Sequence, residues 1–329
     1  MNYIVLDLEW NQGSSGPVSD DNDMPFEIIE IGAVKLNSDR VMIDEFSELI
    51  KPQVYKTMHY MTGKLIHIKM QELKFEKPFE EVIDKFMKWC GEDYVFCTWG
   101  PLDLFELQRN MAHYNIPVLS DRPLAFFDVQ KLFALEYDED KKRRALENAI
   151  DFLNIEKDIP FHRAFSDAYY TAKVFSLIHR PETLIHYSYD LFTAPVDRDH
   201  EIHNFFGDYD KYISRTFATK EAMLADREVK NCTCYICRKA SKRIVRTFTP
   251  NSKYYLAVTF CETHGFVKTK IRVRKTSDDK YFCVKTKKII SEEDATEIKS
   301  RYEKFKAAKK LVKPSLRKSI SDKRLENKQ

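Results

Sequence analysis

The sequence predicts a chain of two parts: an α/β domain with a mixed sheet and flanking helices, then a smaller β-rich module with a basic helical tail. Strand-like runs and amphipathic segments alternate up to about residue 180, which is typical of an α/β domain. Five of the seven cysteines lie in the last third of the chain. The length, 329 residues, is sufficient for a sizeable core but too great for one compact domain.

The first predicted strand is the run YIVLDLEW, which carries Asp7 and Glu9. Side chains alternate along a strand, so both carboxylates project from one face and Ile4, Leu6 and Leu8 project from the other. A polar Gly/Ser/Asp loop at residues 11–25 comes next. Two more strand-like runs, FEIIEIGAVKLN and VMIDEFSELIKP, follow it with the turn sequence NSDR between them. We therefore expect a three-stranded meander.

Helices and strands then alternate. The apolar spacing predicts a helix over residues 79–90 and a strand over 94–99. Pro101 is expected to open the next helix, with Asp103 near its start, where the helix dipole tolerates an anion. An amphipathic segment at 145–153 and a helix beginning at Ser166, whose hydroxyl is suited to an N-cap, complete the domain. Asp167 then lies in the first turn of the last helix.

The acidic residues of these separate segments are expected to meet at one site. Carboxylates from Asp7, Glu9, Asp103 and Asp167 packed together require cations, because without a counter-charge their pKa values rise. Two divalent ions about 4 Å apart would neutralise them and clamp both oxygens of a phosphoryl displacement. All-oxygen ligands favour Mg²⁺ or Mn²⁺. His162, in the loop before the last helix, is suited to accept a proton from water.

In this order the motifs resemble those of the DEDDh 3′-to-5′ exonucleases, a family that includes proofreading subunits of bacterial replicases, ribonuclease T and Eri-type RNA-trimming enzymes. The matching pieces are VLDLEW, FEIIEIGAVKLN, TWGPLDLFELQRN and HRAFSDAYYTAKVF. The resemblance implies an RNase H-like domain with a five-stranded mixed sheet over residues 1–180. It implies metal coordination by Asp7, Glu9, Asp103 and Asp167, general-base catalysis by His162, and release of nucleoside 5′-monophosphates. Arg163 stands where the sister subfamily carries a tyrosine, which favours the histidine subtype.

Residues that could contact the terminal bases are Trp10, Met61, Leu65 and Trp99, because aromatic and apolar faces hold single-stranded ends without reading sequence. The alternative is that large apolar residues of this kind simply pack in the core. We expect single-stranded RNA or DNA 3′ ends as substrates, with RNA favoured. The competing functional class is a non-catalytic nucleic-acid-binding or regulatory protein on an exonuclease-like fold.

Cysteine spacing predicts a metal site in the second part. Cys234-x2-Cys237 and Cys261-x2-His264 are two short chelating turns, typical of a structural zinc site with three cysteines and one histidine. The runs KRIVRTF, YYLAVTF and VKTKIRVRK would supply the hairpins of a zinc-ribbon-like module at residues 229–290. Cys232 is an alternative ligand. Cys283 alternates within a strand-like run and is better explained as a packed residue.

Charge is distributed unevenly along the chain. Residues 229–329 hold 28 Lys and Arg against 10 Asp and Glu, although the whole chain has a net charge of only +3. A basic region gains affinity for nucleic acid by releasing counterions from the phosphate backbone; the alternative is a solvated tail that serves solubility. We expect a partly helical connector at residues 181–228, with a helix around 211–225, and a basic helix and mobile tail at 291–329. The tail could also bind a protein or ribonucleoprotein.

The expected location is cytoplasmic. The first residues, MNYIVLDLEW, lack a basic segment followed by an apolar stretch and a cleavage site. No apolar run approaches the roughly 20 residues needed to span a membrane.

Overall fold

The computed structural model describes residues 1–13, 24–66, 68–138 and 142–326, and it divides into two compact units, Met1–Thr193 and Ala194–Gln329. The predicted polar loop at 11–25 lies largely outside the described residues. Among these residues no helix is long and apolar enough to cross a bilayer.

The first unit is built on a six-stranded sheet in the order β3-β2-β1-β4-β5-β6. The predicted meander is present, because β1 pairs antiparallel with β2 and β2 antiparallel with β3. β1 also pairs in parallel with β4, so the sheet is mixed. A short sixth strand, β6, adds to the predicted five by pairing with β5. The strands are β1 Asn2–Asn11, β2 Glu27–Leu36, β3 Met42–Leu49, β4 Tyr94–Thr98, β5 Leu124–Asp128 and β6 Ser188–Asp190.

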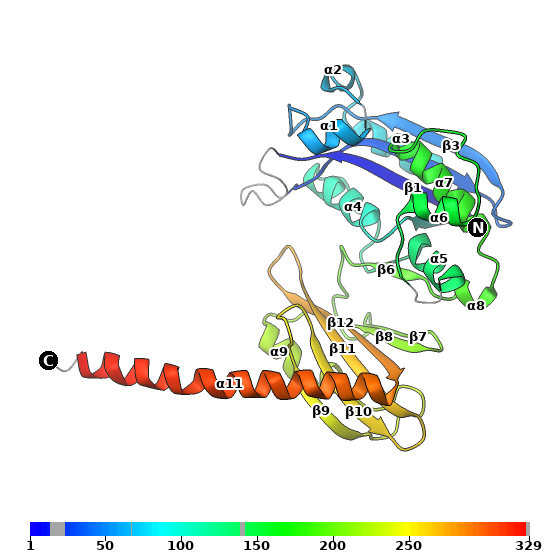
Figure 1. Cartoon of the computed structure of the whole chain (residues 1–329). Helices are drawn as coiled ribbons and strands as arrows, with labels where there is room; N and C mark the ends of the chain where they lie inside the picture. Colours follow the sequence, from blue (N-terminus) through cyan, green and yellow to red (C-terminus); the bar gives the residue numbers. More distant parts are fainter. Residues whose placement is uncertain (14–23, 67, 139–141, 327–329) are drawn as a thin grey trace. The chain divides into compact units, whose positions relative to one another are not determined.

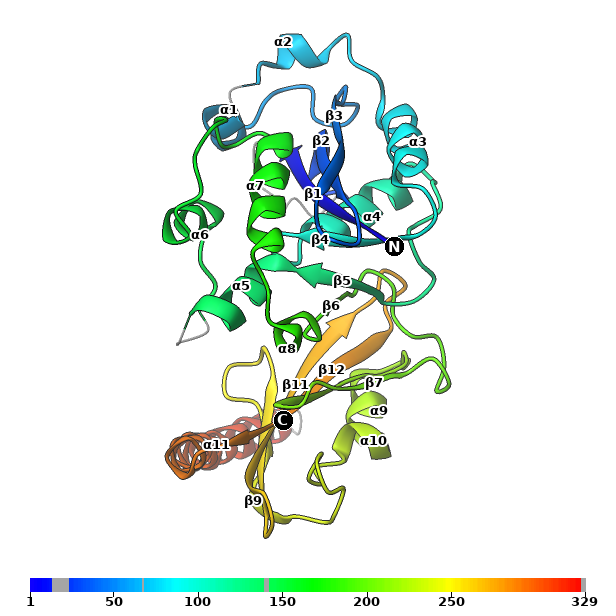
Figure 2. The same ribbon diagram turned by 90° about the vertical axis from the view of Figure 1, so that its right-hand side faces the viewer.

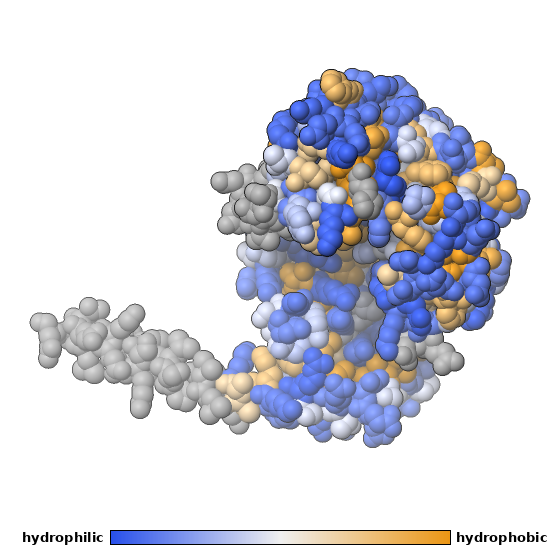
Figure 3. All heavy atoms as spheres, turned by 45° about the horizontal axis from the view of Figure 1, so that its top comes forward, coloured by the Kyte–Doolittle hydropathy of each residue, from blue (hydrophilic) through white to orange (hydrophobic). Residues whose placement is uncertain are grey.

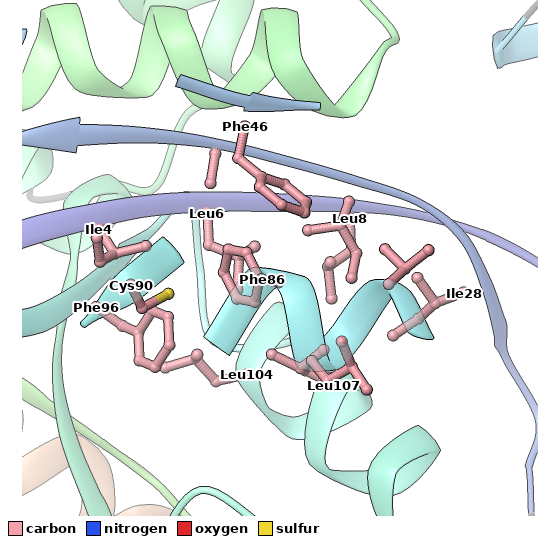
Figure 4. Packing of buried hydrophobic residues seen from close by; sticks show 14 of the residues in the cluster. Ile4, Leu6, Leu8, Ile28, Phe46, Phe86, Cys90, Phe96, Leu104 and Leu107 are labelled. Carbon is pink, nitrogen blue, oxygen red and sulfur yellow. The ribbon is translucent and has the colours of Figure 1, made fainter. Parts of the chain in front are cut away.

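Helices cover both faces of this sheet (Figures 1 and 2). Ile4, Leu6 and Leu8 of β1 pack against α3 and α4, as Figure 4 shows from close by. Val5, two residues before Asp7, packs on the opposite face against α5, α6 and α7. The helices are α1 Tyr60–Ile66, α2 Met70–Leu73, α3 Phe79–Cys90, α4 Asp103–His113, α5 Val129–Tyr137, α6 Leu146–Phe152, α7 Ala164–Ser176 and α8 Pro181–Leu184.

The last long helix of this unit begins earlier than predicted. α7 starts at Ala164 with Arg163 at the N-cap, and Ser166 is a buried residue inside the helix rather than its cap. The free N–H of Ala164 donates instead to the carboxylate of Glu30, 3.3 Å away. A side chain from a neighbouring strand, instead of a local N-cap hydroxyl, therefore satisfies the first N–H of this helix.

The second unit has its own six-stranded sheet, in the order β7-β8-β12-β11-β10-β9. Long helix α11 crosses strands β9 and β10 (Figure 1). It packs on one face against Val245, Phe248 and Leu256. Met223 of α9 and Val229 of α10 pack on a separate cluster with Tyr212 and Ile271. The elements are β7 Ile202–Phe205, β8 Tyr209–Ile213, α9 Lys220–Ala225, α10 Arg227–Lys230, β9 Lys242–Phe248, β10 Tyr255–Cys261, β11 Gly265–Lys275, β12 Tyr281–Ile290 and α11 Glu292–Glu326.

The segment predicted as a connector, 181–228, is not a separate linker. Its first residues form α8 and β6 of the first unit, and the rest supplies β7, β8, α9 and part of α10 to the second. The helix expected around 211–225 is reduced to α9, because residues 209–213 pair with β12 as a strand. Short strands of mixed polarity gave no clear alternation in the sequence, and only pairing with β12 makes them strands. Residues 292–326, expected to begin as a helix and continue as a mobile tail, form α11 throughout.

The surface is mostly hydrophilic on the face shown in Figure 3, with separate hydrophobic patches. Among the large apolar side chains that remain exposed are Tyr60, Met61 and Leu65, all on α1. Single exposed apolar residues are ordinary, but three on one short helix form a local apolar surface.

Candidate active site

The site begins with the two acids of β1. Asp7 and Glu9 lie directly opposite Gly32 and Glu30 of β2, and a β-bulge follows between Glu9 and Trp10. Bulges re-aim side chains and are frequent beside functional sites. The parallel partner β4 pairs with β1 only from Asn2 to Val5, so one edge of β1 is open beyond that point.

Asp103 occupies this open edge. It is the first residue of α4, which follows β4, and its carboxylate accepts hydrogen bonds from its own N–H and from the N–H of Leu8 on β1. Only 7% of its surface is exposed. Burial raises the pKa of Asp103 to about 7 despite these two hydrogen bonds, which act in the opposite direction. The strand-to-helix junction thus brings the third acid to the first two.

The fourth acid, Asp167, depends on a close approach between α7 and β2. A Cβ atom at Gly32 would lie 2.0 Å from the amide nitrogen of Phe165 and 2.1 Å from the carbonyl carbon of Ala164. The first turn of α7 therefore rests directly on the backbone of β2 at Gly32, the residue opposite Asp7. Figure 2 shows α7 lying over β1 and β2. Only glycine permits this contact. In the sequence, the signal for this approach is a lone glycine within a strand-like run.

Three of the four predicted acids form a tight cluster. Carboxylate oxygens of Asp7, Glu9 and Asp167 all lie within 4.8 Å of one another. Asp103 stands outside that mutual distance, although after burial it is the largest cause raising the pKa of Asp7. Burial, then Asp167 and Glu30, raise the pKa of Glu9 to about 8. Burial raises the pKa of Asp167 as well. Such a cluster has a strong affinity for cations, and its oxygen donors suit hard divalent ions.

His162 lies at the entrance to α7. Its backbone adopts a left-handed conformation, with φ of 65°, and its N–H donates to Asp167 Oδ1 at 3.4 Å. The residue is exposed, so the turn presents its imidazole to solvent next to the acids. Histidine tolerates this backbone conformation better than most residues.

An ion pair between the buried Glu30 and Arg163, whose side chain is 41% exposed, fixes this turn. The guanidinium of Arg163 binds the carboxylate of Glu30 with Nε at 3.0 and 3.1 Å and Nη2 at 2.7 Å. Glu30 is only 1% exposed and lies opposite Glu9 in the sheet. Arg163 also opposes the rise in the pKa of Glu9. The sequence placed Arg163 only by comparison with a sister subfamily; its partner 133 residues away could not be read from spacing.

The four predicted base-contacting residues divide into two pairs. Met61 and Leu65 are about half exposed on α1, and Thr62 between them donates to the carbonyl of Trp10 at 3.4 Å, which places α1 beside the end of β1. Trp10 itself is partly buried and packs against the core, and its ring centroid lies 5.4 Å from that of Phe26. Trp99 is partly buried against the other core, near Phe133. Part of each tryptophan thus has a packing role.

The second unit brings the predicted zinc ligands together. Cys234, Cys237, Cys261 and His264 place ligand atoms within 4.8 Å of one another. The sulfurs of Cys237 and Cys261 are 3.6 Å apart, and His264 Nδ1 lies 3.5 Å from Cys234 Sγ and 3.7 Å from Cys261 Sγ. Zn–S bonds of about 2.3 Å give tetrahedral edges of about 3.8 Å, so the four residues fit one tetrahedral ion.

The remaining cysteines are elsewhere. Cys232, the alternative ligand, donates to the carbonyl of Lys230 and is outside this cluster. Cys283 is fully buried in β12. Burial raises the pKa of Cys261, but hydrogen bonds from His264 and nearby groups lower it to about 6 overall, which favours the thiolate that a metal needs.

The fold and the site define an RNase H-like α/β domain of the nuclease class, with an acidic cluster on its central strand. Residues 4–175 match the family model described as Exonuclease, RNase_T. The chain belongs to this exonuclease family.

Individual relatives are more distant. The DNA polymerase III PolC-type of Lactococcus lactis is 29% identical over 118 residues, which cover 36% of this chain but 6% of that protein. Among solved structures, the nuclease domain of 3′hExo, a DEDDh family member bound to rAMP, is 17% identical with a TM-score of 0.46, covering 53% of this chain and 90% of that one. Cell-death related nuclease 4 (CRN-4) is 15% identical with a TM-score of 0.46, covering 73% and 87%.

Proposed function

We propose that this protein is a metal-dependent 3′-to-5′ exonuclease that removes nucleoside 5′-monophosphates from single-stranded nucleic acid, with RNA favoured over DNA. The observation that carries the proposal is the convergence of Asp7, Glu9 and Asp167 within 4.8 Å, with Asp103 beside Asp7 and His162 at the start of the same helix as Asp167. Membership of the exonuclease family supports the same class of reaction.

Each residue has a role that follows from its position. Asp7, Glu9, Asp103 and Asp167 would hold two Mg²⁺ or Mn²⁺ ions, since raised pKa values mark carboxylates that lack a counter-charge. When bound, such ions neutralise the acids and stabilise charge on a phosphoryl group. His162, exposed beside Asp167, accepts the proton of the attacking water.

The apolar surface of α1 would contact the terminal base. Met61 and Leu65 are exposed next to the end of β1, where the acids lie, and stacking on such surfaces does not depend on sequence. Trp10 and Trp99 are proposed as further contacts through the parts that remain exposed. A directional enzyme needs such a contact, because a base held here sets the distance of the scissile bond from the acids.

The four ligands Cys234, Cys237, Cys261 and His264 are proposed to hold one structural Zn²⁺ that joins the 231–239 loop to the β10–β11 hairpin. Four protein ligands leave no open position for chemistry. This ion therefore stabilises the second unit rather than taking part in hydrolysis.

A row of cations on β11 would bind the phosphate backbone. We call Lys268, Lys270, Arg272 and Arg274 the basic strip; their side chains alternate with the buried Val267, Thr269 and Ile271 and the partly buried Val273, and so share one face. In the part of the chain that the structure describes, none of the four pairs with a carboxylate.

Tyr254 lies among these cations. Lys270 Nζ is 4.3 Å from its ring centroid, and Arg301 donates to its hydroxyl at 3.3 Å. The hydrogen bond from Arg301, together with the charges of Lys270 and Arg272, lowers the pKa of Tyr254. Burial and the neighbouring Arg272 and Lys268 lower the pKa of Lys270. Positive charges held together without acids indicate a polyanion partner.

The test uses a single-stranded oligomer labelled at its 5′ end, incubated with purified full-length protein and Mg²⁺ or Mn²⁺. We expect a ladder of stepwise shorter products, and the same strand labelled at its 3′ end should release the label at once as a mononucleotide. Asp7→Ala and His162→Ala should each abolish the ladder. His113→Ala, another histidine of the first unit, is the matched control and should leave it intact.

Three outcomes would contradict the proposal: no shortening by the unmutated protein, shortening from the 5′ end, or equal rates in all variants. Binding without any cleavage would identify the alternative, a non-catalytic nucleic-acid-binding protein. Ribo- and deoxyribo-oligomers of one sequence, compared at equal concentration, test the proposed preference for RNA. A cytoplasmic location and a ribonucleoprotein partner are further proposals, tested by localisation of the tagged protein and by RNase-sensitive co-purification.

A further inference from the structure

The second unit contains a pocket with no part in the proposed nuclease chemistry. Its volume is about 620 Å³, within the range of small-molecule sites. The lining includes two oppositely charged side chains, Asp210 and Lys287, and two aromatic residues, Phe205 and Tyr235. Cys234 of the proposed zinc site lies on its border, so a bound metal would fix one wall.

Three of these residues form a row across neighbouring strands. Phe205 of β7 lies directly opposite Asp210 of β8, and Asp210 is paired with Lys287 of β12. Directly opposite residues project from the same face, with Cβ atoms about 5 Å apart. The sheet therefore presents an acid and a base side by side on the floor of the pocket, with the ring of Phe205 next to the acid at the rim.

The charged groups of this row are Lys287, which is buried, and Asp210, which is partly exposed. Lys287 is only 4% exposed, and among the described residues no acceptor lies within hydrogen-bonding or ion-pairing distance of its Nζ. Asp210 likewise has no donor within such distance in the described chain, and it does not form an ion pair with Lys287. Burial lowers the pKa of Lys287 and raises that of Asp210.

The neighbouring lysine shows that this arrangement is unusual. Lys285, two residues earlier and on the same face, is 1% exposed but binds the carbonyl and the carboxylate of Glu228 and the carbonyl of Asn231. A buried charge without a partner is costly, whereas a ligand that supplies the partner recovers that cost. Lys287 can therefore donate to an acceptor on a ligand, and Asp210 can accept from a donor on the same ligand.

The rim of the pocket is aromatic and apolar. Phe205 is 61% exposed and Ile236 43% exposed. The rings of Phe205 and Tyr235 lie 5.8 Å apart at 47°, and the hydroxyl of Tyr235 donates to the carbonyl of Asp208 at 3.0 Å, which fixes its ring. Exposed aromatic faces above a polar floor suit a flat, polar, aromatic ligand.

We propose that this pocket binds a single unpaired nucleobase, guanine in preference to the others, with Lys287 donating to its O6 or N7 and Asp210 accepting from its N1–H and 2-amino group. Guanine presents two donors next to an acceptor on one edge, and carboxylate and ammonium groups match that pattern. A phosphate group fits less well, because the acids Asp210 and Glu228 offset the cations Lys287 and Arg238 in the lining, so the pocket has no excess of positive charge. The choice of a nucleic-acid base rests on the proposed function; the donor and acceptor geometry does not.

The test measures guanosine binding by equilibrium dialysis, with the full-length, metal-loaded protein carrying Asp7→Ala to disable the active site. Inosine, which lacks the 2-amino group, adenosine, cytidine and inorganic phosphate are the comparison ligands. Lys287→Met and the isosteric Asp210→Asn remove one partner each. Lys288→Met is the matched control, because this residue lies next in the strand on the opposite face. Zinc content and circular dichroism verify the fold of every variant.

We expect guanosine to bind more tightly than the other ligands, and inosine to bind about tenfold more weakly, the value of a hydrogen bond with a charged group. Both pocket variants should lose about tenfold or more, and Lys288→Met should lose nothing. The proposal is overturned by no guanosine binding, by equal binding of all nucleosides, by unchanged binding in folded Asp210→Asn, or by displacement with inorganic phosphate. If the unmutated protein shortens an oligonucleotide but guanosine does not bind, only this inference is refuted. If guanosine binds but no oligonucleotide is shortened, only the nuclease proposal is refuted.

Discussion

Substituting Gly32 by alanine should separate the first turn of α7 from the sheet and so disassemble the acidic cluster. The new Cβ would lie 2.0 Å from Phe165 N and 2.1 Å from Ala164 C, both backbone atoms that cannot rotate away. The start of α7 must therefore retreat by about 1.4 Å to restore an ordinary contact of 3.4 Å. Asp167, in that first turn, moves with it, while Asp7 on β1 stays.

The expected cost follows from these displacements. Overpacking of this kind lowers the free energy of unfolding by about 2 kcal/mol. Misplacing a catalytic group by about 1 Å costs about 100-fold in rate, so kcat/KM should fall by at least that factor. The assays are single-strand shortening at saturating Mg²⁺, denaturant unfolding, and Mn²⁺ affinity by calorimetry.

The matched control is Gly63→Ala in α1. There the new Cβ meets only Met58 Cγ, at 3.1 Å, which belongs to a flexible side chain. Alanine in a helix is more favourable than glycine by about 1 kcal/mol, so this variant should be as stable as the parent or more stable. If Gly32→Ala keeps both its activity and its Mn²⁺ affinity, close packing of α7 on β2 does not assemble the site.

Other expected outcomes follow from single features of the two units. The pKa of Glu9 is raised from 4.5 to about 8 in the folded state, so the metal-free fold binds more protons than the unfolded chain. The free energy of unfolding should therefore fall as the pH rises from about 5 to 8, and Mg²⁺ should restore it. Denaturant midpoints across that range check this, and a free energy of unfolding that rises with pH would contradict it. Arg163→Met leaves the buried Glu30 carboxylate without its partner and should lower the free energy of unfolding by about 2 kcal/mol. Adding Glu30→Gln should restore part of this loss. An unchanged unfolding curve would mean that the ion pair does not stabilise the fold. Cys237→Ser should release the bound metal and unfold the second unit while the first unit stays folded. The parent protein should then show two separate unfolding transitions and the variant only that of the first unit. Zinc retained by the variant would refute the four-ligand site. Replacing three cations of the basic strip by glutamine should reduce the slope of log binding constant against log salt by about 2, and an unchanged slope would exclude the strip from the interface.

The sequence was sufficient to predict secondary structure where the local pattern of apolar and polar residues agrees with the chemistry of the side chains. Alternation along β1 placed Asp7 and Glu9 on one face opposite Leu6 and Leu8, and the meander and the helix at Phe79–Cys90 formed as expected. Motif order indicated that distant acids would meet, and family membership bears out the class of protein.

The sequence pattern gave wrong predictions where contacts between distant segments decide the secondary structure. The strands β7 and β8 were missed because their residues mix polarity, and they are strands only through hydrogen bonds to β12. The start of α7 was misplaced because Glu30, not a local serine, satisfies its first N–H. Both errors arise from contacts between residues far apart in the chain.

The sequence alone determined the chemical groups: four carboxylates, one histidine, three cysteines with a second histidine, and a strongly basic last third. Tertiary structure decided how those groups are held. Contact between α7 and Gly32 sets the acids within reach of one another, and the Glu30–Arg163 pair fixes the turn that carries His162. Pairing of β8 with β12 places Lys287 beside Asp210 in the lining of the pocket of the second unit. A sequence specifies which donors and charges exist, but their distances and desolvation arise only when separate strands and helices pack together.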